Sequence, residues 1–83
     1  MKKIYFSRHA KNRMRKFAIK PDVVRKVLEK PDFLEPSIKG RKNFWRKVQD
    51  KYYRVTCLEE GDKIVVITVT PKEKIPGRVR DED

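Results

Sequence analysis

The only histidine of the sequence lies in a cationic segment and is the first candidate for acid–base chemistry. Arg13 follows His9 by four residues and Lys16 follows it by seven, so the three side chains share one face of a helix. A neutral imidazole could act as a base, and a guanidinium ion could hold a phosphate. On one interpretation of this spacing, His9 and Arg13 act on a phosphate ester. The alternative is that His9 only anchors the helix through a hydrogen bond to a sheet.

Two predicted strands, 42–48 and 52–58, combine aromatic and cationic residues. A two-residue turn at Asp50-Lys51 would pair Gln49 with Tyr52 and Trp45 with Thr56. One face of this hairpin would then carry Asn43, Trp45, Lys47, Tyr52, Arg54 and Thr56. The other face would carry the apolar set Phe44, Val48, Tyr53, Val55 and Cys57, with Arg46 as a misfit.

The first of these faces predicts an RNA interface. Exposed aromatic rings stack on unpaired bases while nearby cations hold the phosphate backbone. Under the alternative, Trp45 and Tyr52 cover a second small core beneath the C-terminal tail. Cations outside the hairpin extend the predicted interface. The basic turn at Lys39, Arg41 and Lys42 could continue a track of phosphate contacts, or it could equally be a solvated loop. The predicted nucleic-acid-binding residues are Arg8, Lys11, Arg15, Arg41, Lys42, Trp45, Lys47 and Tyr52.

The charge of the chain is large and unevenly distributed. The net charge is +11, from 23 basic and 12 acidic residues. Residues 1–56 hold 18 Lys or Arg against 5 Asp or Glu, or +13, and residues 57–83 hold 5 against 7, or −2. Such an excess destabilises a small domain by self-repulsion, and neutralising phosphates is its commonest use. RNA is therefore the expected partner, with DNA or a simple role in solubility as alternatives.

Other classes of site are not expected. Cys57 is the only cysteine, so neither an internal disulfide nor a cysteine-rich zinc site can form, and we interpret Cys57 as a small core residue. One histidine without nearby acids or thiols supplies too few ligands for a metal, and no motif indicates a cofactor. No apolar run approaches the roughly 20 residues that span a bilayer, and no signal peptide is expected. These features predict a cytoplasmic protein without a membrane partner.

Local signals predict the elements that position these residues. Residues 3–6 read as a short strand, and Ser7 is an N-cap for a helix from about Arg8 to Phe17 with Ala10, Met14 and Phe17 as its buried stripe. A second helix begins at Pro21 and ends near Lys30, before Pro31. An edge strand or loop over 33–38 and strands over 42–48, 52–58 and 63–70 follow, with a turn at 59–62.

The predicted fold class is therefore α+β. A short N-terminal strand and two helices precede a three- to four-stranded antiparallel meander, and the apolar run from Ile64 to Val69 is its central strand. Residues 1–71 form one domain, and 72–83 form a charged C-terminal tail.

Several segments in this order resemble the domain-of-unknown-function family 4258. They are SRHAKNRM, AIKPDVVRKVLEKPD, YYRVTC and KIVVITVTPK, and they cover about residues 4–71. The layout is similar to that of RelE- and BrnT-type toxins, in which two helices precede a meander. This resemblance implies a sheet face that engages RNA, a ribonuclease activity and an acidic antitoxin as a protein partner. It also implies His9, Arg13 and Arg54 as the catalytic positions.

Overall fold

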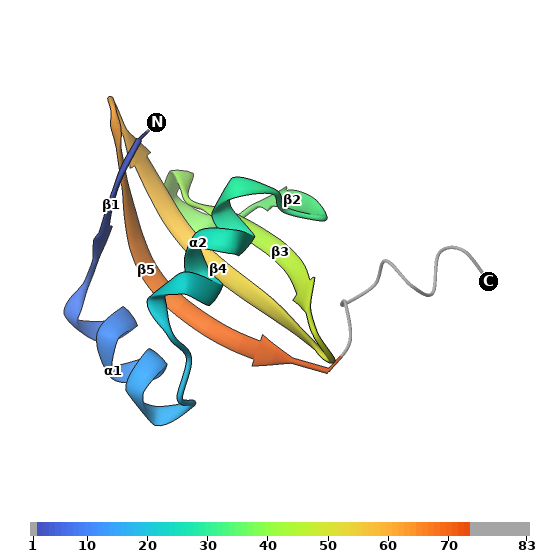
Figure 1. The fold of residues 1–83 in the computed structure, drawn as a ribbon. Helices are drawn as coiled ribbons and strands as arrows, with labels where there is room; N and C mark the ends of the chain where they lie inside the picture. The colour runs from blue at the N-terminus through green and yellow to red at the C-terminus, as the bar shows by residue number, and fades with distance from the viewer. Residues whose placement is uncertain (1, 74–83) are drawn as a thin grey trace.

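The computed structural model describes residues 2–73 of the chain. Two helices lie on one face of a curved sheet, which confirms the predicted α+β class (Figure 1). In chain order the elements are β1 (Lys3–Phe6), α1 (Arg8–Lys16), α2 (Pro21–Glu29), β2 (Phe33–Pro36), a 3-10 turn (Ile38–Gly40), β3 (Lys42–Val48), β4 (Lys51–Glu60) and β5 (Lys63–Lys72).

Five strands form one mixed sheet in the order β1-β5-β4-β3-β2. Strands β2 to β5 form the predicted antiparallel meander, with β2 at its edge and β5 in a central position. β1 instead pairs with β5 in parallel, Lys3 opposite Lys63 and Phe6 opposite Val66. The sheet is therefore mixed, with one parallel pair added to the antiparallel meander. The parallel pair forms because the helices and the meander between β1 and β5 return the chain to the starting edge in the same direction.

The two helices begin where their local signals predict. The Ser7 hydroxyl accepts a hydrogen bond from the Ala10 amide at 3.0 Å and donates one to the Ile67 carbonyl at 3.0 Å. Ser7 therefore caps α1 and also anchors it to β5. α2 has Pro21 at its start and no side-chain cap bond from Lys20. Proline is suited to this position because its fixed φ is helical and its missing N–H would have no helical partner.

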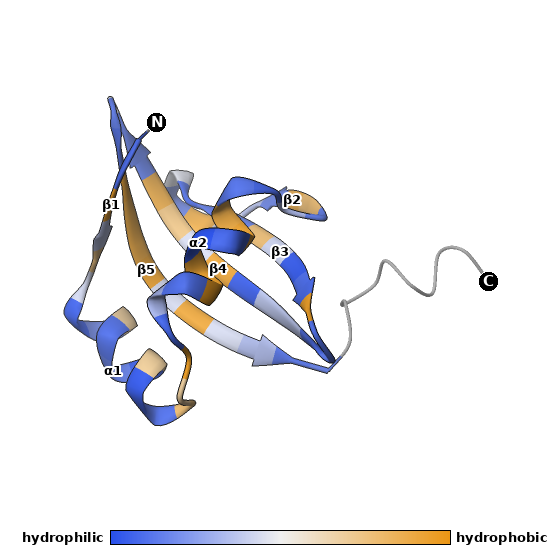
Figure 2. Ribbon diagram, in the orientation of Figure 1, coloured by the Kyte–Doolittle hydropathy of each residue, from blue (hydrophilic) through white to orange (hydrophobic). Residues whose placement is uncertain are grey.

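The main core lies between the helices and the sheet. Figure 2 shows hydrophobic stretches of β4, β5 and α2 gathered where α2 crosses the sheet. Ala10, Met14, Val24 and Val27 are the buried helical residues. The buried core cluster also contains Ile19, Phe44, Val55, Cys57, Ile64, Val66 and Val69.

Two predictions for this core have different outcomes. Cys57 is fully buried, as expected, and burial raises the pKa of its thiol to about 12, so the thiol stays protonated at neutral pH. The prediction that Phe17 is buried is wrong. Phe17 caps the end of α1 and is 37% exposed, with the cationic groups of Arg13 and Lys16 5.1 and 5.5 Å from its ring centroid. Ile19, just beyond the helix, fills the core position instead.

The β3–β4 hairpin has the predicted faces but not the predicted pairing. The turn lies at Gln49-Asp50, where Gln49 has a φ of 60°, and Trp45 is opposite Arg54 rather than Thr56. A shift of two residues keeps every side chain on its predicted face because strand side chains alternate with a period of two. Arg46, the misfit of the apolar face, donates a hydrogen bond of 2.7 Å to the Lys30 carbonyl at the end of α2.

The last strand is longer than predicted. β5 continues through Pro71, which pairs with Tyr53, to Lys72. β1 pairs only with Lys63–Val66, so within residues 2–73 no strand lies beyond the outer edge of β5 at Pro71. A proline is tolerated at such an edge because its missing N–H removes no ladder bond. Of the tail predicted over 72–83, Lys72 belongs to β5, and residues 74–83 lie outside the described residues.

Candidate nucleic-acid interface

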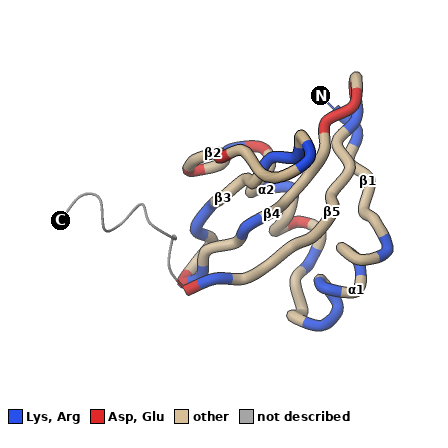
Figure 3. Tube along the Cα trace, turned by 180° about the vertical axis from the view of Figure 1, so that it is seen from behind, with Lys and Arg blue, Asp and Glu red and all other residues tan. Residues whose placement is uncertain are grey.

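The face of the sheet that points away from the helices is the candidate interface, and we call it the open face. Figure 3 views it directly, with Lys and Arg segments visible on β3 and β4 and along α1 behind the edge of the sheet. The open face carries mainly polar and aromatic side chains, with Leu58 and Val65 as apolar members, because most apolar residues of the strands alternate toward the helices. Its aromatic, charged and hydroxyl residues include Tyr5, Phe33, Glu35, Asn43, Trp45, Lys47, Tyr52, Arg54, Thr56, Lys63, Thr68, Thr70 and Lys72.

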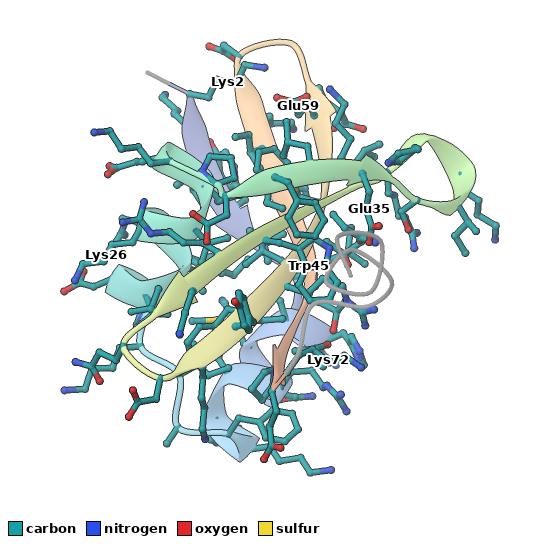
Figure 4. All side chains as sticks on the ribbon, turned by 90° about the vertical axis from the view of Figure 1, so that its right-hand side faces the viewer. Lys2, Lys26, Glu35, Trp45, Glu59 and Lys72 are labelled. Atoms are coloured by element: carbon teal, nitrogen blue, oxygen red, sulfur yellow. The ribbon has the colours of Figure 1, made fainter. Side chains whose placement is uncertain are left out.

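Trp45 is the structural centre of the open face. Its side chain is 0% exposed, yet it lies outside the main core cluster. Its ring stacks on Phe33, with centroids 5.6 Å apart and planes 9° apart, and its Nε1 donates a 2.9 Å hydrogen bond to Glu35 (Figure 4). Asn43 donates to the same carboxylate oxygen at 3.0 Å. The prediction of an exposed Trp45 is therefore wrong. The alternative placed Trp45 and Tyr52 over a second small core beneath the C-terminal tail, and residues 74–83 of that tail lie outside the described residues.

Arg54 lies beside Trp45 and has spare hydrogen-bonding capacity. Its guanidinium carbon is 5.9 Å from the centroid of the Trp45 ring, and one terminal nitrogen is 3.4 Å from the Thr70 hydroxyl. Its Nε is buried and has no hydrogen-bond partner within residues 2–73. An unpaired buried donor on a cation costs free energy, so Arg54 has a strong preference for an anionic acceptor.

Two further cation–aromatic pairs flank this centre. The ammonium group of Lys47 is 5.7 Å from the ring centroid of Tyr52, and that of Lys63 is 5.7 Å from the ring centroid of Tyr5. Tyr5 is 50% exposed. Among the described residues no ion pair engages Lys47 or Arg54, whereas Lys63 has a loose contact of 3.8 Å with Glu60.

The sequence interpretation omitted Tyr5 and Lys63. The parallel pairing of β1 with β5 brings these residues together, and it joins segments almost sixty residues apart in sequence. The alternation of the KIYF strand, with Ile4 and Phe6 facing the core, would have placed Tyr5 on the open face.

Helix α1 carries a second group of cations. Arg8, Lys11, Arg15 and Lys16 are exposed, Arg13 is half-buried, and the helix contains no acidic residue. None of the ion pairs found in residues 2–73 involves these cations. The three basic residues of the last turn stabilise the helix dipole, but Arg8 stands at the positive end, where a cation is unfavourable. Local helix energetics therefore do not explain the whole charge of α1.

The three residues expected to be catalytic do not form one cluster. His9 and Arg13 belong to α1, which packs on β1 and β5, whereas Arg54 lies on the open face of β4. No hydrogen bond, ion pair or ring contact joins them in the part of the chain that the structure describes. His9 is exposed and makes no hydrogen bond there either, so the anchoring role considered for it belongs to Ser7. The Nε of Arg13 is buried without a hydrogen-bond partner in residues 2–73.

The predicted phosphate track at Arg41 and Lys42 is interrupted. Glu59 accepts hydrogen bonds from Lys42 at 2.9 Å and from Lys2 at 3.0 Å, on the side of the sheet that faces the helices. The hydrogen bond from Glu59 raises the pKa of Lys42, and the hydrogen bonds from Lys42 and Lys2 lower the pKa of Glu59. Lys42 is therefore occupied and does not line the open face. Arg41 is half-buried at the end of the 3-10 turn, and its carbonyl accepts from the Ser37 amide.

We expect this carboxylate to contribute to acid sensitivity. A carboxyl group with a lowered folded pKa stabilises the fold above its unfolded pKa of about 4.5, and this contribution is lost as the pH falls through the lower folded value. Replacing Glu59 by Gln should lower the Tm by only a few degrees at pH 7, because the paired groups are partly exposed to solvent. The loss of Tm should be smaller at pH 3, because part of the stabilisation by the ionised carboxylate is already gone there. Thermal unfolding at both pH values tests this, and an equal loss of Tm at pH 3 and pH 7 would show that the ionised pair contributes nothing.

The described part of the chain shows neither a metal site nor a membrane-spanning helix. It contains no group of three or more His, Cys, Asp or Glu residues placed to hold a metal ion. None of its helices is long and apolar enough to cross a membrane.

Comparison with known proteins gives one match. A family model described as a domain of unknown function (DUF4258) matches residues 6–71. No curated protein and no solved structure matches the chain, so the RelE-like layout stays a prediction. The family match runs from the last residue of β1 to Pro71 of β5, so it includes α1 and most of the open face but not Tyr5. The chain belongs to the DUF4258 family.

Proposed function

We propose that the protein binds single-stranded RNA across its open face, with the cations of α1 as additional phosphate contacts. The observation that carries the proposal is the row of three cation–aromatic pairs, Lys63–Tyr5, Arg54–Trp45 and Lys47–Tyr52, on a sheet face that no helix covers. The rings of Tyr5 and Tyr52 give a sequence-tolerant platform for bases, whereas the buried ring of Trp45 supports Arg54 from below. The cations beside these rings can exchange a ring contact for a phosphate.

The shape of the surface favours an unpaired strand over a DNA duplex. Reading a duplex requires an element that enters the major groove, whereas a sheet face accepts bases that are splayed out of a helix. The hydroxyls of Thr68 and Thr70 lie along the middle of the open face and suit the 2′-hydroxyls of RNA, whereas the buried Thr56 donates to Asn43. Binding RNA would place the protein in the cytoplasm.

Binding without cleavage is the better-supported form of this proposal. General acid–base chemistry on a phosphate requires the base within hydrogen-bond reach of the reacting hydroxyl and a cation at the phosphate. His9 on α1 and Arg54 on the open face come from different layers of the fold. The arrangement therefore supports retention of RNA more than its hydrolysis.

The test is a binding titration with a fluorescent single-stranded RNA of mixed sequence, repeated at several salt concentrations and with duplex DNA as comparator. We expect tighter binding to RNA and a linear fall of log K with log salt concentration. The recovered RNA is then examined for length. Intact RNA supports a binding protein, whereas cleavage that disappears in His9→Ala or Arg54→Ala would establish a ribonuclease. Absence of binding at low salt would refute the proposal.

Tyr52 provides a specific test of the aromatic contribution. Tyr52→Ala is expected to weaken RNA binding about tenfold or more, because stacking on one base contributes roughly 1–3 kcal/mol. The salt slope should not change, since stacking releases no counterions. Tyr52→Phe should bind almost as the wild type does, and Lys47→Ala should reduce the salt slope by about 0.7. If the Phe variant is as weak as the Ala variant, the ring of Tyr52 is not a stacking platform.

A further inference from the structure

A second surface lies on the opposite side of the fold, at the free edge of β1. The amides of Lys3 and Ser7 donate to the carbonyls of Asp62 and Val66, both at 3.0 Å, so the odd residues of β1 direct their backbone groups toward β5. The even residues Ile4 and Phe6 then direct their N–H and C=O groups outward. In residues 2–73 no strand pairs with this edge. The edge is therefore a template for an added strand.

A pocket of about 620 Å³ adjoins this edge on the helix side of the sheet. Ile4 of β1, Ile64 of β5 and Leu28 of α2 form its apolar floor. α1 packs on β5 and β1, and α2 crosses β3 and β4 (Figure 1). The pocket lies between Ile4 of β1 and the Leu28 end of α2. An added strand would place every second side chain on this side of the sheet, and one apolar side chain of that strand could occupy the pocket.

The rim of the pocket is predominantly cationic. Lys2, Arg25 and Lys30 line it together with a single acid, Glu29. Arg25 has a 3.3 Å contact with Asp22, and Lys2 binds Glu59, whereas Lys30 has no ion pair within residues 2–73. With the paired acids counted, the cations Lys2, Lys42, Arg25 and Lys30 exceed Glu29, Glu59 and Asp22 by one charge, four against three. This local excess and the net charge of +11 favour an acidic partner over a second copy of the chain.

From these observations we infer that the β1 edge and its pocket bind an extended, acidic segment of a partner protein. The segment adds a strand to β1 through the backbone groups of Ile4 and Phe6. One apolar side chain enters the pocket, and acidic side chains two residues before and after it meet Lys2 and Lys30. This inference is independent of RNA binding, since the surface shares no residue with the open face.

The probe is a capped peptide of sequence Thr-Glu-Thr-Leu-Thr-Glu-Thr, in which the leucine and both glutamates project to one side of a strand. Binding is followed by fluorescence anisotropy and by hydrogen exchange of the backbone amides. We expect saturable binding, with exchange at Ile4 and Phe6 slowed about tenfold or more at saturation because both amides gain a strand partner. The same peptide with lysine in place of glutamate should not bind.

Lys30→Glu and Lys26→Glu form a matched pair of variants. Both lysines are exposed, Lys26 in the last turn of α2 and Lys30 at its C-cap, but only Lys30 lines the pocket. Lys30→Glu should weaken peptide binding about tenfold, because the attractive contact of Lys30 with one glutamate becomes repulsive, and Lys26→Glu should change it by about twofold at most. RNA binding should respond equally to both variants.

Three results would overturn the inference. Equal loss of peptide binding in both variants would indicate unspecific electrostatics. Peptide binding without protection of the Ile4 and Phe6 amides would exclude strand addition. Protection of these amides that rises with protein concentration alone, together with dimerisation in sedimentation, would identify a second copy of the chain as the occupant.

Discussion

Trp45→Ala is expected to lower the free energy of unfolding by about 3–5 kcal/mol, a large part of the roughly 5–15 kcal/mol that stabilises a small domain. Trp45 is fully buried on the open face, and no helix lies above it to fill the resulting cavity. The substitution removes the stack on Phe33 and the hydrogen bond to Glu35. It also leaves Arg54 without its aromatic neighbour. Denaturant unfolding followed by circular dichroism measures the effect.

Trp45→Phe is the matched control. A phenylalanine keeps a ring against Phe33 but cannot donate to Glu35, whose carboxylate retains the hydrogen bond from Asn43. We expect this variant to lose about 1–2 kcal/mol. A loss below about 1 kcal/mol for Trp45→Ala would contradict the view that Trp45 is the centre of a second core.

The second large effect concerns the cations of α1. Replacing Arg8, Lys11 and Arg15 by Ala should reduce the slope of log K against log salt concentration for single-stranded RNA by about 2, since each lost phosphate contact contributes roughly 0.7. Affinity at low salt should fall about tenfold or more. Because alanine is the strongest helix former and the three side chains are exposed, α1 should remain folded.

A triple variant of α2 separates contact from net charge. Arg25, Lys26 and Lys30 are exposed, and replacing them by Ala removes the same three positive charges from a different helix. We expect a much smaller change in slope for this variant. An equal change would show that RNA responds only to total charge, and the assignment of α1 as a contact surface would then be wrong.

Local signals predicted much of the fold. Ser7 capping α1, Pro21 beginning α2 and the bounds of β3 depend on interactions within a few residues, which a sequence displays directly. The faces of the β3–β4 hairpin were also predictable, because alternation survives a shift of the turn from Asp50-Lys51 to Gln49-Asp50.

Features that depend on distant segments were not predictable in this way. The parallel pairing of β1 with β5 and the tethering of Lys42 to Glu59 join residues that only the completed sheet brings together. Trp45 was expected to be exposed because the side chains of its strand alternate between two faces, and Trp45 lies on the face opposite the apolar one. Its burial depends on Phe33 and Glu35 of β2, a strand whose pairing the sequence left open.

The candidate interface also combines residues that local patterns placed correctly with residues that only long-range pairing brings in. Lys47, Tyr52 and Arg54 share the predicted face, whereas Tyr5 and Lys63 enter it only through the β1–β5 pair. His9 and Arg13 share a helix, as their spacing predicts. They are separated from Arg54 because α1 packs on β5 and β1, whereas Arg54 lies on the open face of β4. The spacing of residues along one helix does not predict where that helix packs on the sheet.

The most direct test of RNA binding by the open face is a titration of the protein with single-stranded RNA, followed by backbone amide chemical shifts in low salt. We predict that the largest changes occur at Tyr5, Tyr52 and Arg54 and along α1, with little change in α2. If no amide chemical shift changes at low salt, or if the changes concentrate on α2 and the pocket beside β1, the claim that the open face binds RNA is contradicted.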